Sequence, residues 1–147
     1  MRQDLVRQLR GDEGVERHAY QDHLGFWTIG VGRLIDKRKP GSGLRPHEID
    51  YLLYSDIDDR VDALSRKLPW FNELDDARRG VLLNMSFQLG VEGLLGFTTT
   101  LEHVRRGEFE KAGEQMLKSK WAQQTPARAR RMSAQMITGK WQFADGA

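Results

Sequence analysis

Apolar residues recur every three to four positions through most of the chain, which is the spacing of an amphipathic helix. The longest such run begins at Pro46, carries Glu48 in its first turn and ends before Pro69. Proline suits the first helical position, and an acidic first turn complements the helix dipole. We therefore predict one helix over 46–68, about 33 Å long at roughly 1.5 Å per residue, long enough to connect two lobes.

The helical pattern continues in shorter segments on both sides of this helix. Residues 73–89 form the most apolar segment and should be a buried central helix that ends at Gly90, with a short turn of helix over 91–96 after it. Glycine also marks the end of a first helix, over 3–13, at Gly14. The other expected helices run from the N-cap Thr98 to about Arg106, from Glu108 to Ser119, and from Pro126 to Thr138 after the N-cap Thr125.

Helical periodicity is missing between residues 18 and 36. Aromatic and β-branched residues such as Tyr20, Trp27 and Ile29 alternate there with glycines. This pattern predicts a two- or three-stranded antiparallel sheet with a turn around 23–25. Residues 36–46, which combine charges with proline and glycine, should form a loop.

Composition indicates a single globular domain of 147 residues with 39% hydrophobic and 30% charged residues. The absence of cysteine excludes disulfides, zinc–thiolate sites and thiol nucleophiles. Residues 101–147 hold nine Lys/Arg against five Asp/Glu, a net +4, whereas residues 1–100 hold 14 against 16, a net −2. The basic C-terminal part favours an anionic partner. We expect no secretory signal and no stable membrane insertion, because the N-terminus lacks an apolar core and no stretch approaches about 20 apolar residues.

The most promising chemistry lies in residues 9–34, which contain Glu13, Asp22 and Thr28. Glycoside hydrolysis commonly uses two carboxyl groups, one that donates a proton and one that stays ionised. Burial near a helix end would favour the protonated form of Glu13, while Asp22, beside a turn, should stay ionised. The Thr28 hydroxyl could orient a water molecule. Acidic pairs at this spacing are common, so the pattern alone does not decide between catalysis and an ordinary surface.

Other chemistries find less support in the sequence. The four histidines lack the spacing of metal ligands, and the serines lie in no nucleophile elbow. No phosphate-binding loop is present. The basic run at 37–39 has no interleaved aromatic residues, so nucleic-acid binding is not expected. We therefore expect neither a metal nor another cofactor.

Three separated motifs occur in order along the chain. They comprise Leu9, Arg10, Asp12–Gly14, Tyr20, Asp22, Gly25, Thr28–Gly30, Gly32 and Leu34; then Leu83–Met85, Phe87, Gln88, Gly90, Gly93 and Gly96–Thr98; and finally Trp121, Gln124–Pro126, Arg128 and Arg131. Together these motifs resemble the T-even-phage type of lysozyme, the phage muramidases of glycoside hydrolase family 24. The resemblance extends over nearly the whole chain.

The resemblance implies an α+β, mainly α, lysozyme-like fold with two lobes. Residues 14–45 would form a small N-terminal β-sheet lobe, and 46–68 would be the connecting helix. Residues 69–147 together with 1–13 would form a helical lobe, with the cleft between the lobes. The whole chain, 1–147, would be one lysozyme domain.

The resemblance also implies a reaction, the hydrolysis of the β-1,4 bond between N-acetylmuramic acid and N-acetylglucosamine with inversion. Glu13 would be the general acid, Asp22 the second carboxylate and Thr28 the residue that positions water. Inversion implies that the two carboxyl groups lie roughly 6.5–9.5 Å apart. The substrate-binding positions would be Leu34, Phe87, Thr100 and Gln115, with Gln88 and Arg128 in support. Arg128 would pair with Glu13 across the cleft and favour its ionised form.

Two positions depart from the family pattern. Arg33 stands where the best-known members have histidine, and we predict that it contacts Asp56. Leu24 replaces an acidic residue, which removes an ion pair to the position of Lys120. Neither change removes a catalytic group.

The resemblance leaves the biological setting open between a phage endolysin and a virion-associated lysozyme. We expect a monomer that acts on bacterial peptidoglycan. An endolysin without a signal peptide would stay in the host cytoplasm until its release to the cell wall. Membrane disruption by the last helices is a further hypothesis. The alternatives are a lytic transglycosylase, against which the Asp22–Thr28 pair argues, and a non-catalytic peptidoglycan-binding module.

Overall fold

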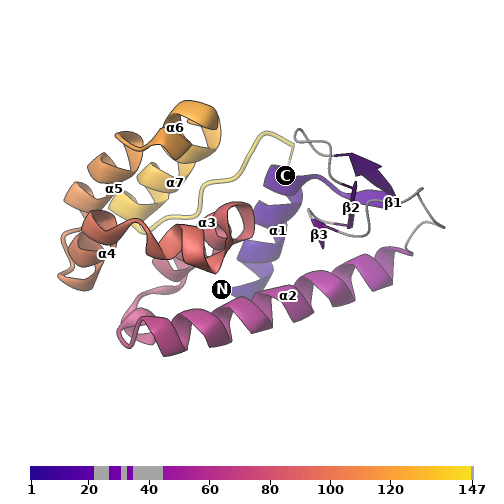
Figure 1. Cartoon of the computed structure of the whole chain (residues 1–147), viewed down its shortest axis with the longest axis horizontal. Coiled ribbons are helices and arrows are strands. Elements are labelled where there is room, and N and C mark those ends of the chain that lie inside the picture. The colour runs from indigo at the N-terminus through magenta and orange to yellow at the C-terminus, as the bar shows by residue number, and fades with distance from the viewer. Residues whose placement is uncertain (22–26, 31–32, 35–44, 147) are drawn as a thin grey trace.

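The computed structural model describes residues 1–21, 27–30, 33–34 and 45–146, and for 16–21, 27–30 and 33–34 it describes the backbone alone. Helices dominate (Figure 1). The elements are α1 (Arg2–Glu13), β1 (Glu16–Gln21), β2 (Trp27–Gly30), β3 (Arg33–Leu34), α2 (Pro46–Lys67), the 3-10 helix η1 (Phe71–Glu73), α3 (Asp76–Leu95), α4 (Thr98–Arg105), α5 (Phe109–Leu117), α6 (Lys120–Gln124) and α7 (Pro126–Thr138).

The predicted long helix is confirmed as α2. It begins at Pro46, and the Arg45 backbone N–H donates to Glu48 Oε1 over 3.2 Å at its start. It ends at Lys67, two residues before Pro69. The helix runs along one side of the molecule, from the strands to the turn before α3 (Figure 1). Its buried face consists of Ile49, Leu53, Ile57 and Leu64.

The central apolar helix differs from the prediction at its start. Residues 71–73 form η1 instead, and α3 begins at Asp76 after the N-cap Asp75, whose carboxylate accepts the Arg78 N–H. The predicted break at Gly90 is confirmed. Gly90 takes a non-helical conformation with φ 76°, which glycine adopts without strain, and the second helical segment of α3 runs from this kink to Leu95.

The later helices follow the prediction with small shifts. Phe97, not Thr98, is the N-cap residue of α4, and α6 was not predicted. Thr125 occupies the cap position of α7, but its hydroxyl donates to Trp121 O, 3.0 Å away. The predicted end at Gly139 is confirmed, with the glycine in the left-handed conformation.

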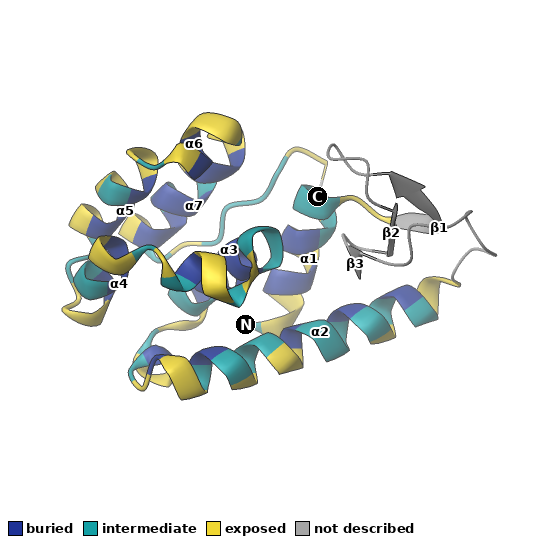
Figure 2. Cartoon of the chain, viewed as in Figure 1, coloured by how far each residue is buried: buried dark blue, intermediate teal, exposed yellow. Residues whose placement is uncertain are grey.

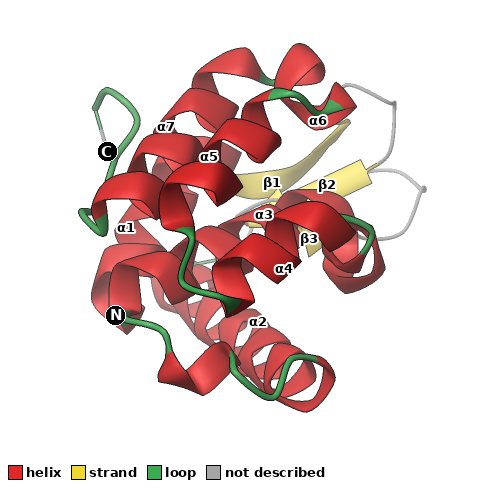
Figure 3. Ribbon diagram, turned by 90° about the vertical axis from the view of Figure 1, so that its left-hand side faces the viewer, coloured by secondary structure: helices red, strands yellow, loops and turns green. Residues whose placement is uncertain are grey.

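The helices surround one apolar core (Figure 2). Its largest fully buried side chains are Phe71, Leu5, Leu9, Ile49, Ile57, Leu64, Leu82, Leu83, Met85, Leu94, Met116 and Met132. Helices α5 and α7 run side by side in front of the strands when the molecule is viewed from the side (Figure 3). Gly113 permits this approach, because a Cβ there would lie 2.6 Å from Ile137 Cγ1.

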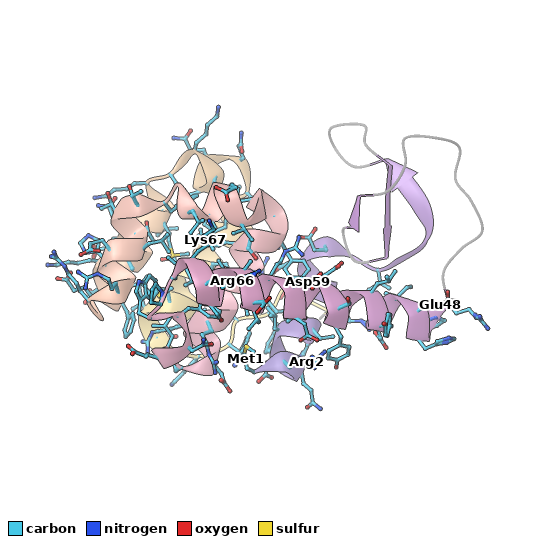
Figure 4. All side chains as sticks on the ribbon, turned by 60° about the horizontal axis from the view of Figure 1, so that its bottom comes forward. Met1, Arg2, Glu48, Asp59, Arg66 and Lys67 are labelled. Carbon is cyan, nitrogen blue, oxygen red and sulfur yellow. The ribbon has the colours of Figure 1, made fainter. Side chains whose placement is uncertain are left out.

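Polar contacts fix the start of α1 against its neighbours. The Met1 amino group lies 3.1 Å from Asp76 Oδ2 on α3, and Arg2 Nη2 lies 3.1 Å from Asp58 Oδ2 on α2. Figure 4 shows Met1 and Arg2 together at this end of α1. These two contacts hold the start of α1 against both α2 and α3.

The strands form a three-stranded antiparallel sheet in the order β1-β2-β3. They gather beside the first turns of α2, away from α4–α6 (Figure 1). In the register, Thr28 on the central strand is paired with Tyr20 on one side and Leu34 on the other. The turn predicted around 23–25 lies outside the described residues.

The predicted fold class needs correction. Residues 1–15 and 45–146 are 79% helical and contain no strand, which makes this body all-α and not α+β. The three strands are short, with six, four and two residues. The helices, which the apolar periodicity predicted, therefore determine the fold class, and the short sheet does not. The division of the chain at 14–45, 46–68 and 69–147 stays a prediction.

In the described part of the chain, no single helix is both long and apolar enough to cross a membrane. Helices α3 and α4 pass that test only when taken together, and they are bent by 99° at their junction.

Candidate active site

Glu13 is the last residue of α1, and its position follows from the way this helix ends. Gly14 adopts φ 75°, in the left-handed region that favours glycine, and its N–H donates to Arg10 O over 3.1 Å. The chain then turns away toward β1. The Glu13 side chain is left at the helix end with 18% of its surface exposed.

Arg128, in the first turn of α7, holds this carboxyl group. Its Nη2 donates to Glu13 Oε1 over 2.9 Å, and its Nε donates to Asn84 Oδ1 on α3 over 2.9 Å. The predicted pairing of Arg128 with Glu13 is therefore confirmed. Three helices that are far apart in sequence meet at this guanidinium. Among the described residues, only Arg128 is recorded as a hydrogen-bond partner of the Glu13 carboxyl group.

A second ion pair lies directly beneath the first. The Asp12 side chain is fully buried. Its Oδ2 accepts a hydrogen bond of 2.9 Å from Asn84 Nδ2, and its Oδ1 lies 2.5 Å from Arg131 Nη2. Arg128 Nε lies 3.7 Å from Asp12 Oδ2, so the two pairs are in contact. Two carboxylates and two guanidinium groups balance each other, as buried charges require. We define these four residues, Asp12, Glu13, Arg128 and Arg131, as the buried cluster.

Buried amides extend the buried cluster into the core. Asn84 Nδ2 also donates to Gln8 Oε1 over 2.8 Å, and Gln8 Nε2 donates to Gln135 Oε1 over 2.5 Å. Gln135 Nε2 in turn donates to Ala77 O over 2.7 Å. Because each of these side chains has defined partners, Asn84 is fixed in orientation, and it fixes Arg128 and Asp12.

The remaining helical positions predicted to bind substrate lie on α3, α4 and α5. The Arg60 guanidinium stands 4.1 Å from the centre of the Phe87 ring. Gln88 Oε1 accepts a hydrogen bond of 2.8 Å from the indole of the buried Trp121. Thr100 and Gln115 come together as two walls of one open pocket of about 200 Å³.

The sheet side of the predicted site is described through its backbone alone. Thr28 and Leu34 are neighbours in the register of β2 and β3. Asp22 and Leu24 lie outside the described residues, so the separation of the two carboxyl groups stays a prediction. The Arg33–Asp56 contact also stays a prediction, because the Arg33 side chain is not among those described.

The model of the phage lysozyme family matches residues 10–135, which include α1 from Arg10, the strands and every buried-cluster residue. The chain belongs to the phage lysozyme family. It is 31% identical to the pre-baseplate central spike protein Gp5 of Enterobacteria phage T4 over 92% of its own length, but spans only 28% of that protein.

Two further relatives come from Dictyostelium discoideum. The chain is 26% identical to probable T4-type lysozyme 1, covering 89% of this chain and 92% of that protein. It is 27% identical to probable T4-type lysozyme 2, covering 92% and 94% respectively. Membership of the phage lysozyme family supports a muramidase-type peptidoglycan hydrolase, a glycoside hydrolase with peptidoglycan as its substrate.

Sequence reasoning missed the supporting roles of Asp12, Asn84 and Gln8 in this lysozyme site. One signal was available. Arg128 and Arg131 are three residues apart on one helix and therefore share a face. Nothing in the local pattern indicates that Asn84 bonds to Asp12 and Gln8, because these partners are more than 70 residues away in sequence.

Proposed function

We propose that this protein is a muramidase that hydrolyses the β-1,4 bond between N-acetylmuramic acid and N-acetylglucosamine, with Glu13 as the general acid. One observation carries the proposal. Glu13 is a partly exposed carboxyl group at a helix end, and a buried arginine holds one of its oxygens. A proton donor needs such a fixed position with access to the leaving oxygen.

The buried cluster supplies electrostatic stabilisation for this step. Glu13 passes its proton to the glycosidic oxygen and becomes a carboxylate. Negative charge therefore develops 2.9 Å from the Arg128 guanidinium, which is already in place and needs no reorganisation. Asn84 and Asp12 keep that guanidinium oriented.

The second half of the proposed reaction depends on Asp22 and Thr28. Asp22 stays ionised and activates water, which Thr28 positions, for attack on the opposite face of the sugar. The product then has inverted configuration, and the carboxyl groups of Glu13 and Asp22 lie roughly 6.5–9.5 Å apart. The antiparallel pairing of β2 with its neighbours supports a defined place for Thr28.

We propose bacterial lysis by a phage as the biological setting. The relatives include both a baseplate spike protein and free-standing T4-type lysozymes, so an endolysin and a virion-associated enzyme are both compatible with the family. An endolysin would act as a monomer on the wall after release from the host cytoplasm. The net positive charge of residues 101–147 suits an anionic wall.

Digestion of purified peptidoglycan by wild type and Glu13→Gln tests the proposal. We expect reducing N-acetylmuramic acid ends from the wild type and a loss of at least about a thousandfold in rate for Glu13→Gln. Anhydro-sugar ends would identify a lytic transglycosylase instead. Binding without any product from the wild type would indicate a non-catalytic wall-binding module.

Asp22→Asn separates catalysis from binding at the second carboxylate. We expect it to abolish clearing of a peptidoglycan suspension while binding to the insoluble polymer is kept.

Inactive variants that still kill permeabilised cells would show that the last helices act on membranes. Loss of killing in Glu13→Gln would contradict that hypothesis.

A further inference from the structure

After α7 the chain crosses the helical body and returns to α1 (Figure 1). We call residues 140–146 the strap; they contain no helix or strand. The Trp141 ring lies against Gly80 of α3, where a Cβ would come within 2.7 Å of Trp141 Cζ3. Phe143 stacks on Trp141 with centroids 6.4 Å apart, and the Arg7 guanidinium stands 4.1 Å from the Phe143 ring centre. The strap is therefore packed against both α3 and α1.

The backbone of the strap bonds to two buried amide side chains. The C=O of Gln142 accepts from Gln8 Nε2 over 2.9 Å, and its N–H donates to Gln135 Oε1 over 3.0 Å. Gln8 and Gln135 are fully buried and bond to each other. The Gln142 side chain instead donates to Lys140 O over 3.3 Å, at the surface. The strap thus supplies one acceptor and one donor to amides that are shielded from water.

The charges of the buried cluster dictate the orientation of these amides. A carboxylate accepts and a guanidinium donates, so Asn84 must turn its Nδ2 toward Asp12 and its Oδ1 toward Arg128. The second N–H of Asn84 Nδ2 then needs an acceptor, which is Gln8 Oε1 at 2.8 Å. Gln8 therefore directs its Nε2 toward Gln135 and the strap carbonyl. We call Asn84, Gln8 and Gln135 the amide network.

A change at the strap is transmitted through the amide network to the arginine. Without the strap carbonyl, one N–H of Gln8 would be buried without an acceptor, which is costly in the interior. Rotation of the Gln8 amide would relieve that cost, but it would turn a donor toward the N–H of Asn84. Asn84 would then rotate as well, and Arg128 would lose the acceptor that orients it. Because buried amides satisfy one another, the network responds as a unit.

We propose that Gln8 is a positioning residue for the general acid Glu13, and that the docked strap keeps the Gln8 amide in its orientation. The inference rests on the proposed function. Gln8 does not touch the acid. It acts through Asn84 and Arg128, whose Nη2 donates to Glu13 Oε1 over 2.9 Å. When this arrangement loosens, the proton donor is displaced from the leaving oxygen, so kcat falls while substrate binding is kept.

Four variants test the inference. Gln8→Met keeps a side chain of similar length but removes its three hydrogen bonds. Gly80→Ala changes no residue of the amide network and places a methyl group against Trp141 of the strap. Val6→Ala, at a buried apolar position of the same helix as Gln8, is the control for a loss of stability alone. Gln142→Ala is the control for the strap, because it keeps the backbone N–H and C=O.

Kinetics on soluble peptidoglycan fragments, with thermal melting of each variant, separates positioning from folding. We expect Gln8→Met to lower kcat about tenfold with KM unchanged, and Gly80→Ala to lower kcat about threefold. Val6→Ala should lower Tm and leave kcat as in the wild type, and Gln142→Ala should change neither. If Gln8→Met lowers Tm but not kcat, its role is structural and the inference is overturned. Wild-type kinetics in Gly80→Ala would contradict the role of the strap.

The Arg128 Nε–H provides a readout that does not depend on turnover. It donates to Asn84 Oδ1, so its hydrogen exchange, measured by NMR, should be slow in the wild type and in Val6→Ala, and about tenfold faster in Gln8→Met. If the wild type releases no reducing ends but exchange responds to Gln8→Met, the hydrolase proposal fails and the coupling of Gln8 to Arg128 stands. If the wild type cleaves the fragments and Gln8→Met changes neither kcat nor exchange, the positioning inference alone fails.

Discussion

Charged residues form two contrasting groups in this lysozyme. The buried cluster joins α1 to α7, with Asp12 fully buried and the Arg128 side chain 9% exposed. The other group lies on α4 and α5, where Glu102 pairs with Arg105 and Arg106, and Glu108 pairs with His103 and Lys111. We call these six residues the surface set. Glu102 and Arg105 are 44% and 49% exposed.

The contrast shows that the number of ion pairs says little about their importance. The surface set has more short contacts, but water screens its charges and the side chains lose entropy on pairing. In the buried cluster each charge depends on the others, because an unpaired charge in the interior is strongly destabilising. The same burial that makes the cluster sensitive to mutation also fixes Glu13 for catalysis.

The largest effect should come from Arg128→Met, which leaves Glu13 and Asp12 without their shared partner. We expect a loss of about 3–5 kcal/mol in the free energy of unfolding, the usual result of breaking a buried pair. Urea denaturation measures it. Arg130→Met, an exposed arginine on the same helix, is the control and should change stability by less than about 0.5 kcal/mol. If Arg128→Met and Arg130→Met lowered the free energy of unfolding equally, burial of the ion pairs would not matter for stability.

The ends of the helices were predictable from sequence because local chemistry fixes them. Pro46 begins α2, and Gly14 and Gly139 take left-handed conformations after α1 and α7. Gly90 interrupts α3 where its glycine predicted a break, and the helical segment beyond it reaches Leu95 with Leu94 buried. Local signals therefore mark where a helix is interrupted, and long-range packing decides whether it resumes.

The buried cluster was predictable only in part. The resemblance supplied Arg128 as the partner of Glu13, a contact across 115 residues that periodicity alone could not give. Gln8 is fully buried in α1 although its side chain is polar. Its partner Gln135 is 127 residues away, and no local pattern records such a pairing. Polar residues inside a core are the positions where binary patterning fails.

A smaller effect is expected from Asn84→Leu, which removes no charge but takes away the hydrogen bonds of Asn84 to Arg128 Nε and Asp12 Oδ2. The cost should be about 1–3 kcal/mol, that of an unsatisfied buried polar group. Peptidoglycan hydrolysis should fall as well, because Arg128 is no longer held toward Glu13. If the variant is as stable as the wild type but less active, Asn84 serves only to position Arg128. Unchanged activity would contradict this positioning role.

Salt should separate the two groups further. Charges at the surface are screened over about 3 Å in 1 M salt, whereas buried pairs are screened much less. We therefore expect the destabilisation by Glu102→Gln to be small in dilute buffer and to vanish in 1 M NaCl. The destabilisation by Arg128→Met should persist. Thermal unfolding of both variants at the two salt concentrations makes the comparison, and parallel salt responses would show that the cluster is hydrated.

The smallest expected effect is a pH dependence of the surface set. Hydrogen bonds from Arg105, supported by Arg106, lower the pKa of Glu102 from 4.5 to about 2. A carboxyl group whose pKa is lowered on folding stabilises the native state above its unfolded pKa, and it loses that contribution as the pH falls through the folded value. The Tm difference between wild type and Glu102→Gln should therefore be constant above about pH 5 and shrink toward zero near pH 2. If the Tm difference instead grew on acidification, the ionised form of Glu102 would be destabilising. The exposed ion pairs would then lower the stability of the native state.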